Sequence, residues 1–68
     1  QPTNPLQALS AREREVAEAV AKGLSNKQVA QGLAITERTV KAHLASVFDK
    51  LAVRDRMQLA LLVARARM

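Results

Sequence analysis

The segment from Ser25 to Leu44, SNKQVAQGLAITERTVKAHL, constrains the fold more than any other part of the chain. Its first residue is followed three positions later by Gln28, a capping-box pattern that marks the start of a helix. The apolar spacing breaks at Ala34, and Thr36 is then a second N-cap candidate. Apolar residues resume at the spacing of a longer helix, at Val40, Leu44, Val47 and Leu51. A short helix, a tight turn and a longer helix together form a helix-turn-helix motif.

Capping patterns predict two further helices, one on each side of this motif. Ser10 and Glu13 form another capping box, and Gly23 provides a stop for the helix that they begin. Asp55 and Gln58 mark the start of the last helix. We therefore expect an all-α, compact four-helix domain. Its helices should cover about residues 11–22, 26–33, 37–51 and 56–67, with the helix-turn-helix motif over residues 25–44.

Length and composition limit the chain to one small, basic domain. Of its 68 residues, 49% are hydrophobic and only Phe48 is aromatic, so aliphatic side chains and alanines must fill the core. The net charge of +5 favours polyanionic partners, nucleic acid first, although a well-solvated surface would carry the same charge. The absence of cysteine excludes disulfides and thiolate metal sites. The uncharged stretch of residues 57–64 is far too short to cross a bilayer, and so is the longest one, residues 1–11.

The first eight residues, QPTNPLQA, are predicted to be the remnant of a linker. Pro2 and Pro5 disfavour an α-helix there. We expect the domain proper to occupy residues 9–68 and to be a piece of a longer protein.

Catalytic and cofactor sites are not expected. His43 is the only histidine, and Ser10 and Ser25 are explained as helix caps. There is no glycine-rich phosphate loop and no histidine or carboxylate cluster at metal-binding spacing. We therefore expect no enzyme activity, no metal or other cofactor, no small-molecule ligand and no membrane association.

The last predicted helix carries two apolar stripes. One suits the domain core and comprises Leu59, Val63 and Ala66. The other lies on a different side of the helix and comprises Met57, Leu61, Ala64 and Met68. A domain this small cannot easily bury both stripes. The second stripe is either a dimer interface or one exposed patch on a helix that otherwise packs into the core.

Residues along nearly the whole chain resemble the LuxR-type (NarL/FixJ-like) DNA-binding domain. The resemblance begins with Leu9-Ser10, Arg12 to Val16 and Gly23 to Lys27. It continues through Val29-Ala30, Leu33, Ile35-Thr36, Thr39-Val40-Lys41, His43, Lys50-Leu51, Val53 and Arg56, and spans roughly residues 9–64. There are small departures: Ala52 stands where the family often has glycine or a polar residue, and Ala34 occupies a variable turn position.

The resemblance implies a four-helix domain at the C-terminus of bacterial transcription regulators. Its third helix reads the DNA major groove, and its fourth helix often mediates dimerisation. The expected function is therefore sequence-specific binding of double-stranded DNA, as a homodimer, by the output domain of a two-component response regulator. RNA polymerase is a further candidate partner, and the expected location is the bacterial cytoplasm, on the nucleoid. The alternative is a helical protein-interaction module that docks through the second stripe of residues 56–67.

Base reading is expected from the face of residues 37–51 that lies opposite the apolar stripe, near the helix start. That face carries Glu37, Arg38, Lys41, Ala42, Ala45 and Ser46. The family resemblance implies base reading at the positions of Lys41, Ala42 and Ala45. Lysine can donate to guanine O6 and N7, whereas alanines can contact only thymine methyl groups. With alanine at two of three positions, we expect specificity to rely on DNA shape and half-site spacing.

Phosphate contacts are expected at the ends of the two helices of the motif. Asn26 and Lys27 begin the first of them, where free N–H groups and the helix dipole favour an anion. Thr36 and Thr39 begin the second and can donate hydroxyls to the DNA backbone. Two further candidates are His43, as a packing or phosphate-facing residue, and Lys50, as a charge near the far end.

Overall fold

The structure, a computed structural model, describes residues 4–66. They form a short 3-10 helix, η1 (Pro5–Ala8), and four α-helices: α1 (Ala11–Ala21), α2 (Asn26–Leu33), α3 (Glu37–Leu51) and α4 (Arg56–Ala66). The predicted all-α, four-helix fold is confirmed, with α1 one residue shorter than expected. Residue 67, which was predicted to end the last helix, lies outside the described range.

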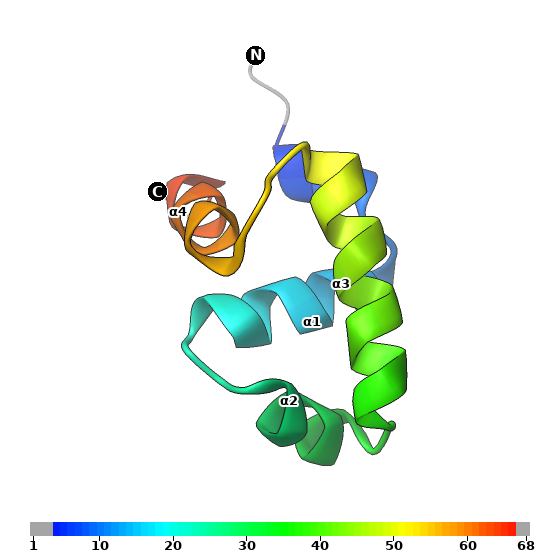
Figure 1. The fold of residues 1–68 in the computed structure, drawn as a ribbon. Coiled ribbons are helices and arrows are strands. Elements are labelled where there is room, and N and C mark those ends of the chain that lie inside the picture. Colours follow the sequence, from blue (N-terminus) through cyan, green and yellow to red (C-terminus); the bar gives the residue numbers. More distant parts are fainter. Residues whose placement is uncertain (1–3, 67–68) are drawn as a thin grey trace.

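Helix α1 lies in the middle of the domain and contacts all three other α-helices (Figure 1). Helices α2 and α4 lie on opposite sides of it, and α3 runs along one edge and packs on both α1 and α2. The shared core consists of Leu6, Leu9, Val16, Ala17, Val20, Val29, Ala30, Val40, Leu44, Val47, Leu51, Leu59 and Val63. Within the described residues, no helix has the length and apolar character needed to cross a membrane.

The predicted N-caps hold the helix starts. The Ser10 and Ser25 hydroxyls accept the backbone N–H groups of Glu13 and Gln28, each at 3.2 Å. Both capping boxes close, because the side chains of Glu13 and Gln28 accept the cap residues' own N–H groups at 2.8 Å. Thr36 caps α3 by accepting the Thr39 N–H at 3.1 Å. These local bonds satisfy N–H groups that a helix start leaves without intrahelical partners.

Three helices end through a residue with positive φ. Gly23 ends α1 with φ 93°, a conformation that glycine adopts without penalty. Helices α2 and α3 end instead at Ala34, with φ 57°, and Ala52, with φ 56°. At each alanine the next residue donates its N–H back into the last turn, from Ile35 to Ala30 at 3.0 Å and from Val53 to Phe48 at 3.1 Å. Alanine is strained in this region, and glycine is the residue that usually occupies it.

Residues 5–8, which were placed in the predicted linker remnant, form the 3-10 helix η1 and no α-helix. Pro5 takes the first position of η1, where its missing N–H costs nothing and its fixed φ fits the helix. Leu6 is buried in the core, and Arg14 donates to its carbonyl at 3.2 Å. Residues 5–8 therefore pack with the domain. Pro2 lies outside the described residues.

Candidate nucleic-acid interface

Packing fixes which face of α3 points outward. Its apolar stripe is buried against the other helices through Val40, Leu44, Val47 and Leu51. A stripe at spacings of i, i+4, i+7 and i+11 is exposed, and it comprises Arg38, Ala42, Ala45 and Asp49. Lys41 is exposed beside it. The three predicted base-reading residues, Lys41, Ala42 and Ala45, are thus all on the solvent side of α3.

Ser46 does not belong to this outward face, contrary to expectation. It is half-buried and donates its hydroxyl to Glu13 Oε2 on α1. The other carboxylate oxygen of Glu13 accepts from Lys50 Nζ at 2.8 Å and from the Ser10 N–H at 2.8 Å. One buried carboxylate therefore ties the start of α1 to the C-terminal half of α3.

Sequence reasoning treated Glu13 only as part of a capping box. The signal for a second role was available, since Glu13 precedes Val16, Ala17 and Val20 by three, four and seven residues. That spacing places it on the buried face of α1, where it is 6% exposed. A carboxylate on a buried face needs hydrogen-bond donors from a neighbouring element.

The donors around Glu13 keep it charged. The hydrogen bond from Lys50 lowers its pKa most, followed by those from Ser46 and the Ser10 backbone, to about 2 from an ordinary value of 4.5. The ammonium of Lys50, predicted to contact phosphate, thus has a charged partner inside the domain. Its contact with DNA stays a prediction, beside a structural role that was not foreseen.

The start of α2 is held by α4. Arg56, the first residue of α4, donates to Asn26 Oδ1 and to the Leu24 carbonyl, each at 2.8 Å. Asn26 is half-buried, and its Oδ1 is the atom that accepts from Arg56, so its amide nitrogen is the side-chain group left as a donor. Lys27, the next residue, is exposed. The two predicted phosphate contacts on α2 therefore lie at a helix start to which the Arg56 guanidinium is hydrogen-bonded.

The remaining predicted phosphate contacts lie along α3. The Thr36 and Thr39 hydroxyls are 2.9 Å apart and hydrogen-bonded to each other, with Thr36 exposed and Thr39 half-buried. Thr36 is therefore a helix cap on an exposed residue. His43 is half-buried on a different side of α3 from the Arg38 stripe.

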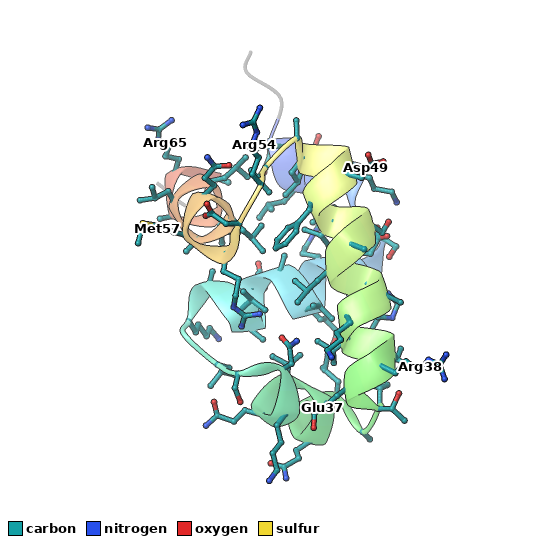
Figure 2. All side chains as sticks on the ribbon, in the orientation of Figure 1. Glu37, Arg38, Asp49, Arg54, Met57 and Arg65 are labelled. Atoms are coloured by element: carbon teal, nitrogen blue, oxygen red, sulfur yellow. The ribbon has the colours of Figure 1, made fainter. Side chains whose placement is uncertain are left out.

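Helix α4 exposes one of its two apolar stripes. Leu59 and Val63 are fully buried, as predicted for the core stripe. Met57 is 74% exposed, Leu61 is 58% exposed and Ala64 is also exposed. Met57 and Arg65 extend away from the other helices (Figure 2). Met68, the last member of the predicted stripe, lies outside the described residues.

Similarity to known proteins identifies the family to which this four-helix domain belongs. Residues 7–63 match the family described as bacterial regulatory proteins, luxR family. The chain belongs to the LuxR family. This LuxR-family chain is therefore a DNA-binding transcription regulator domain and not an enzyme.

Several relatives of this LuxR-family domain are response regulators or transcriptional regulators. It is 48% identical to the transcriptional regulatory protein LnrK of Bacillus subtilis over 91% of this chain and 28% of the relative. It is 42% identical to the nitrate/nitrite response regulator protein NarP of Escherichia coli over 94% of this chain and 30% of the relative. It is 46% identical to the two-component response regulator PprB of Pseudomonas aeruginosa over 98% of this chain and 25% of the relative. The chain thus spans only 25–30% of the length of these relatives.

Proposed function

We propose that this domain binds double-stranded DNA sequence-specifically, with the N-terminal half of α3 in the major groove. The observation that supports the proposal most directly is the outward face of α3, where small alanines flank exposed basic side chains. Small residues let a helix approach the base edges closely, and basic residues provide the donors that guanine accepts. The acid of the outward stripe, Asp49, lies at the opposite end of the helix from Arg38 (Figure 2).

Lys41 is the proposed base-reading donor, with Ala42 and Ala45 against thymine methyl groups. Lys41→Ala is expected to weaken binding to the selected site by roughly 1–3 kcal/mol and to weaken binding to random DNA less. Competition binding on both DNAs measures the difference. Equal losses on the two would identify Lys41 as a phosphate contact instead.

Lys27 is the proposed phosphate contact at the start of α2, with Lys50 near the far end of α3 and with Asn26, Thr36, Thr39 and His43 as weaker contacts. Lys27→Ala should reduce the slope of log affinity against log salt by about 0.9, because one counterion fewer is released. Lys22→Ala, at the exposed end of α1 and outside the motif, is the control. An unchanged slope for Lys27→Ala would remove it from the interface.

We further propose that a second copy of this chain covers the stripe of Met57, Leu61 and Ala64, to which Met68 would contribute. Exposed apolar side chains on one helix suit a two-fold contact, in which the same patch serves both subunits. Two domains side by side would also let half-site spacing supply specificity that a largely alanine face lacks.

Light scattering with and without two-half-site DNA tests the dimer. Leu61→Ser is expected to abolish cooperative binding to two half-sites while leaving binding to one half-site unchanged, and Gln31→Ser on α2 is the matched exposed control. A single monomeric species under both conditions would contradict the dimer.

The whole protein is proposed to be a two-component response regulator, with this domain as its C-terminal output. NarP and PprB, both response regulators by name, support this assignment. The protein would then act on the nucleoid in the bacterial cytoplasm and contact RNA polymerase. Reading the gene upstream of Gln1 tests it: a domain with an acidic phosphoacceptor pocket is expected, and a small-molecule sensor domain would contradict it.

The exposed stripe of α4 also favours the second candidate, a protein-interaction module without DNA binding. A gel shift with random DNA at low salt separates the two. A docking module should leave the DNA unshifted, whereas the proposed function requires a shift that salt weakens.

A further inference from the structure

The outward face of α3 carries a second strong donor. We propose that Arg38 reads a guanine in the major groove, at the base pair next to the one that Lys41 reads. The proposal rests on the proposed DNA-binding function, and it specifies which base pairs each half-site should contain. It would also supply the hydrogen-bond readout that alanine at positions 42 and 45 cannot provide.

Arg38 lies closer than Lys41 to the direction opposite the core. At 3.6 residues per turn, Arg38 points about 150° away from the mean direction of the buried stripe, and Lys41 about 90° away. Arg38 is also the first member of the exposed stripe that continues through Ala42, Ala45 and Asp49. Its place in the first turn of α3 is where a recognition helix meets base edges.

The guanidinium of Arg38 is available for DNA. Arg12, Arg14 and Arg56 each hold a partner within the domain. Within residues 4–66 the side chain of Arg38 makes no hydrogen bond or ion pair, and it extends away from the other helices (Figure 2). Because Ala42 and Ala45 end at Cβ, this guanidinium reaches further from the helix than the side chains beside it. Asp49 is about 16 Å further along the helix axis, too far to neutralise it.

The spacing of the two donors fits adjacent base pairs. Arg38 and Lys41 are three residues apart, which is roughly 4.5 Å along the helix axis. Successive base pairs are about 3.4 Å apart. The arginine fork matches guanine O6 and N7 in a bidentate pair, whereas lysine offers a single ammonium. Each half-site is therefore expected to contain two neighbouring G·C pairs.

Guanine-to-adenine substitutions in a site selected from random DNA test this pairing. For the wild-type domain, replacing either guanine is expected to weaken binding about 5- to 150-fold. Arg38→Ala should lose discrimination at one guanine and keep it at the other, and Lys41→Ala should do the reverse. Arg38→Lys keeps the charge and should recover only part of the discrimination. Arg54→Ala removes another exposed arginine, between α3 and α4, and should keep both preferences.

The outcomes separate this inference from the function on which it rests. Arg38→Ala weakening selected and random DNA equally, with a flatter salt slope, would make Arg38 a phosphate contact and overturn the inference alone. Unchanged binding would also overturn it alone. Failure of the wild-type domain to bind any DNA would reject the proposed function itself. Circular dichroism of Arg38→Ala should match the wild type, because the site is exposed and alanine favours helix.

Discussion

Replacing Ala52, the alanine that ends α3, by glycine tests whether the backbone geometry there decides the sign of the change in the free energy of unfolding. Ala52 has φ 56° and ψ 39°. An L-residue is disfavoured in this left-handed region by about 1–2 kcal/mol. Glycine escapes that penalty but loses more backbone entropy on folding, worth about 0.4–1 kcal/mol. Ala52→Gly is therefore expected to raise the free energy of unfolding by about 0.5–1 kcal/mol.

For a domain of this length, such a gain corresponds to a rise in Tm of about 2–8 °C. Ala34, which ends α2 just before α3 begins, has nearly the same geometry, with φ 57° and ψ 42°. Since α3 separates the two sites by about 22 Å, their effects should be independent. The double variant Ala34→Gly/Ala52→Gly is expected to gain about 1–2 kcal/mol.

Ala45→Gly is the matched control, because the same atoms are removed at an exposed position in the middle of the same helix. It should lose about 1 kcal/mol. Urea unfolding followed by circular dichroism measures all the variants, and the midpoints should move with an unchanged slope. If Ala52→Gly proved as destabilising as Ala45→Gly, the left-handed ending of α3 would be refuted.

Three further predictions concern polar contacts between helices. Glu13→Gln should lower the Tm at neutral pH, because an amide replaces the charged acceptor of Lys50, whereas Glu15→Gln on the exposed side of α1 should not. Because the pKa of Glu13 is lowered from 4.5 to about 2 on folding, the unfolded chain binds the proton first as the pH falls. The stabilisation by ionised Glu13 is then complete above pH 4.5 and lost between pH 4.5 and about 2. The Tm difference between wild type and Glu13→Gln should therefore close in that window. A pH-independent difference would contradict the ion pair. Lys50→Ala should also lower the Tm, because it removes the ion pair with Glu13, and should reduce the salt slope of DNA binding by about 0.9; an unchanged slope would show that Lys50 contacts no phosphate. Arg56→Lys should lower the free energy of unfolding by about 1 kcal/mol, because one ammonium cannot replace the guanidinium that donates to two acceptors. If this variant lost no more stability than Arg54→Ala, the two hydrogen bonds of Arg56 would contribute nothing.

Much of the candidate interface followed from local patterns. Caps at Ser25 and Thr36, together with apolar spacing, placed both helices of the motif to within one residue. The same periodicity put Lys41 on the solvent side of α3. These predictions succeeded because capping and helical periodicity act between residues at most a few positions apart.

The missed features all join residues that are distant in sequence. Glu13 meets Lys50 across 37 positions, and Arg56 meets Asn26 across 30. Helix periodicity says which side of a helix is buried, but not which residue of another helix faces it. Leu6 was missed for the same reason, since only the packing of η1 reveals that it is buried.

The sequence by itself determined the number, the approximate ends and the apolar core stripes of the four α-helices, and its resemblance indicated the family. Tertiary packing decided which basic side chains have a partner inside the domain. It pairs Lys50 with Glu13 and Arg56 with Asn26 and Leu24, outside the motif, whereas Lys27, Arg38 and Lys41 within the motif are exposed. The physical reason is that a formal charge belongs to a residue, whereas its availability depends on the donors and acceptors that the fold brings within hydrogen-bonding distance.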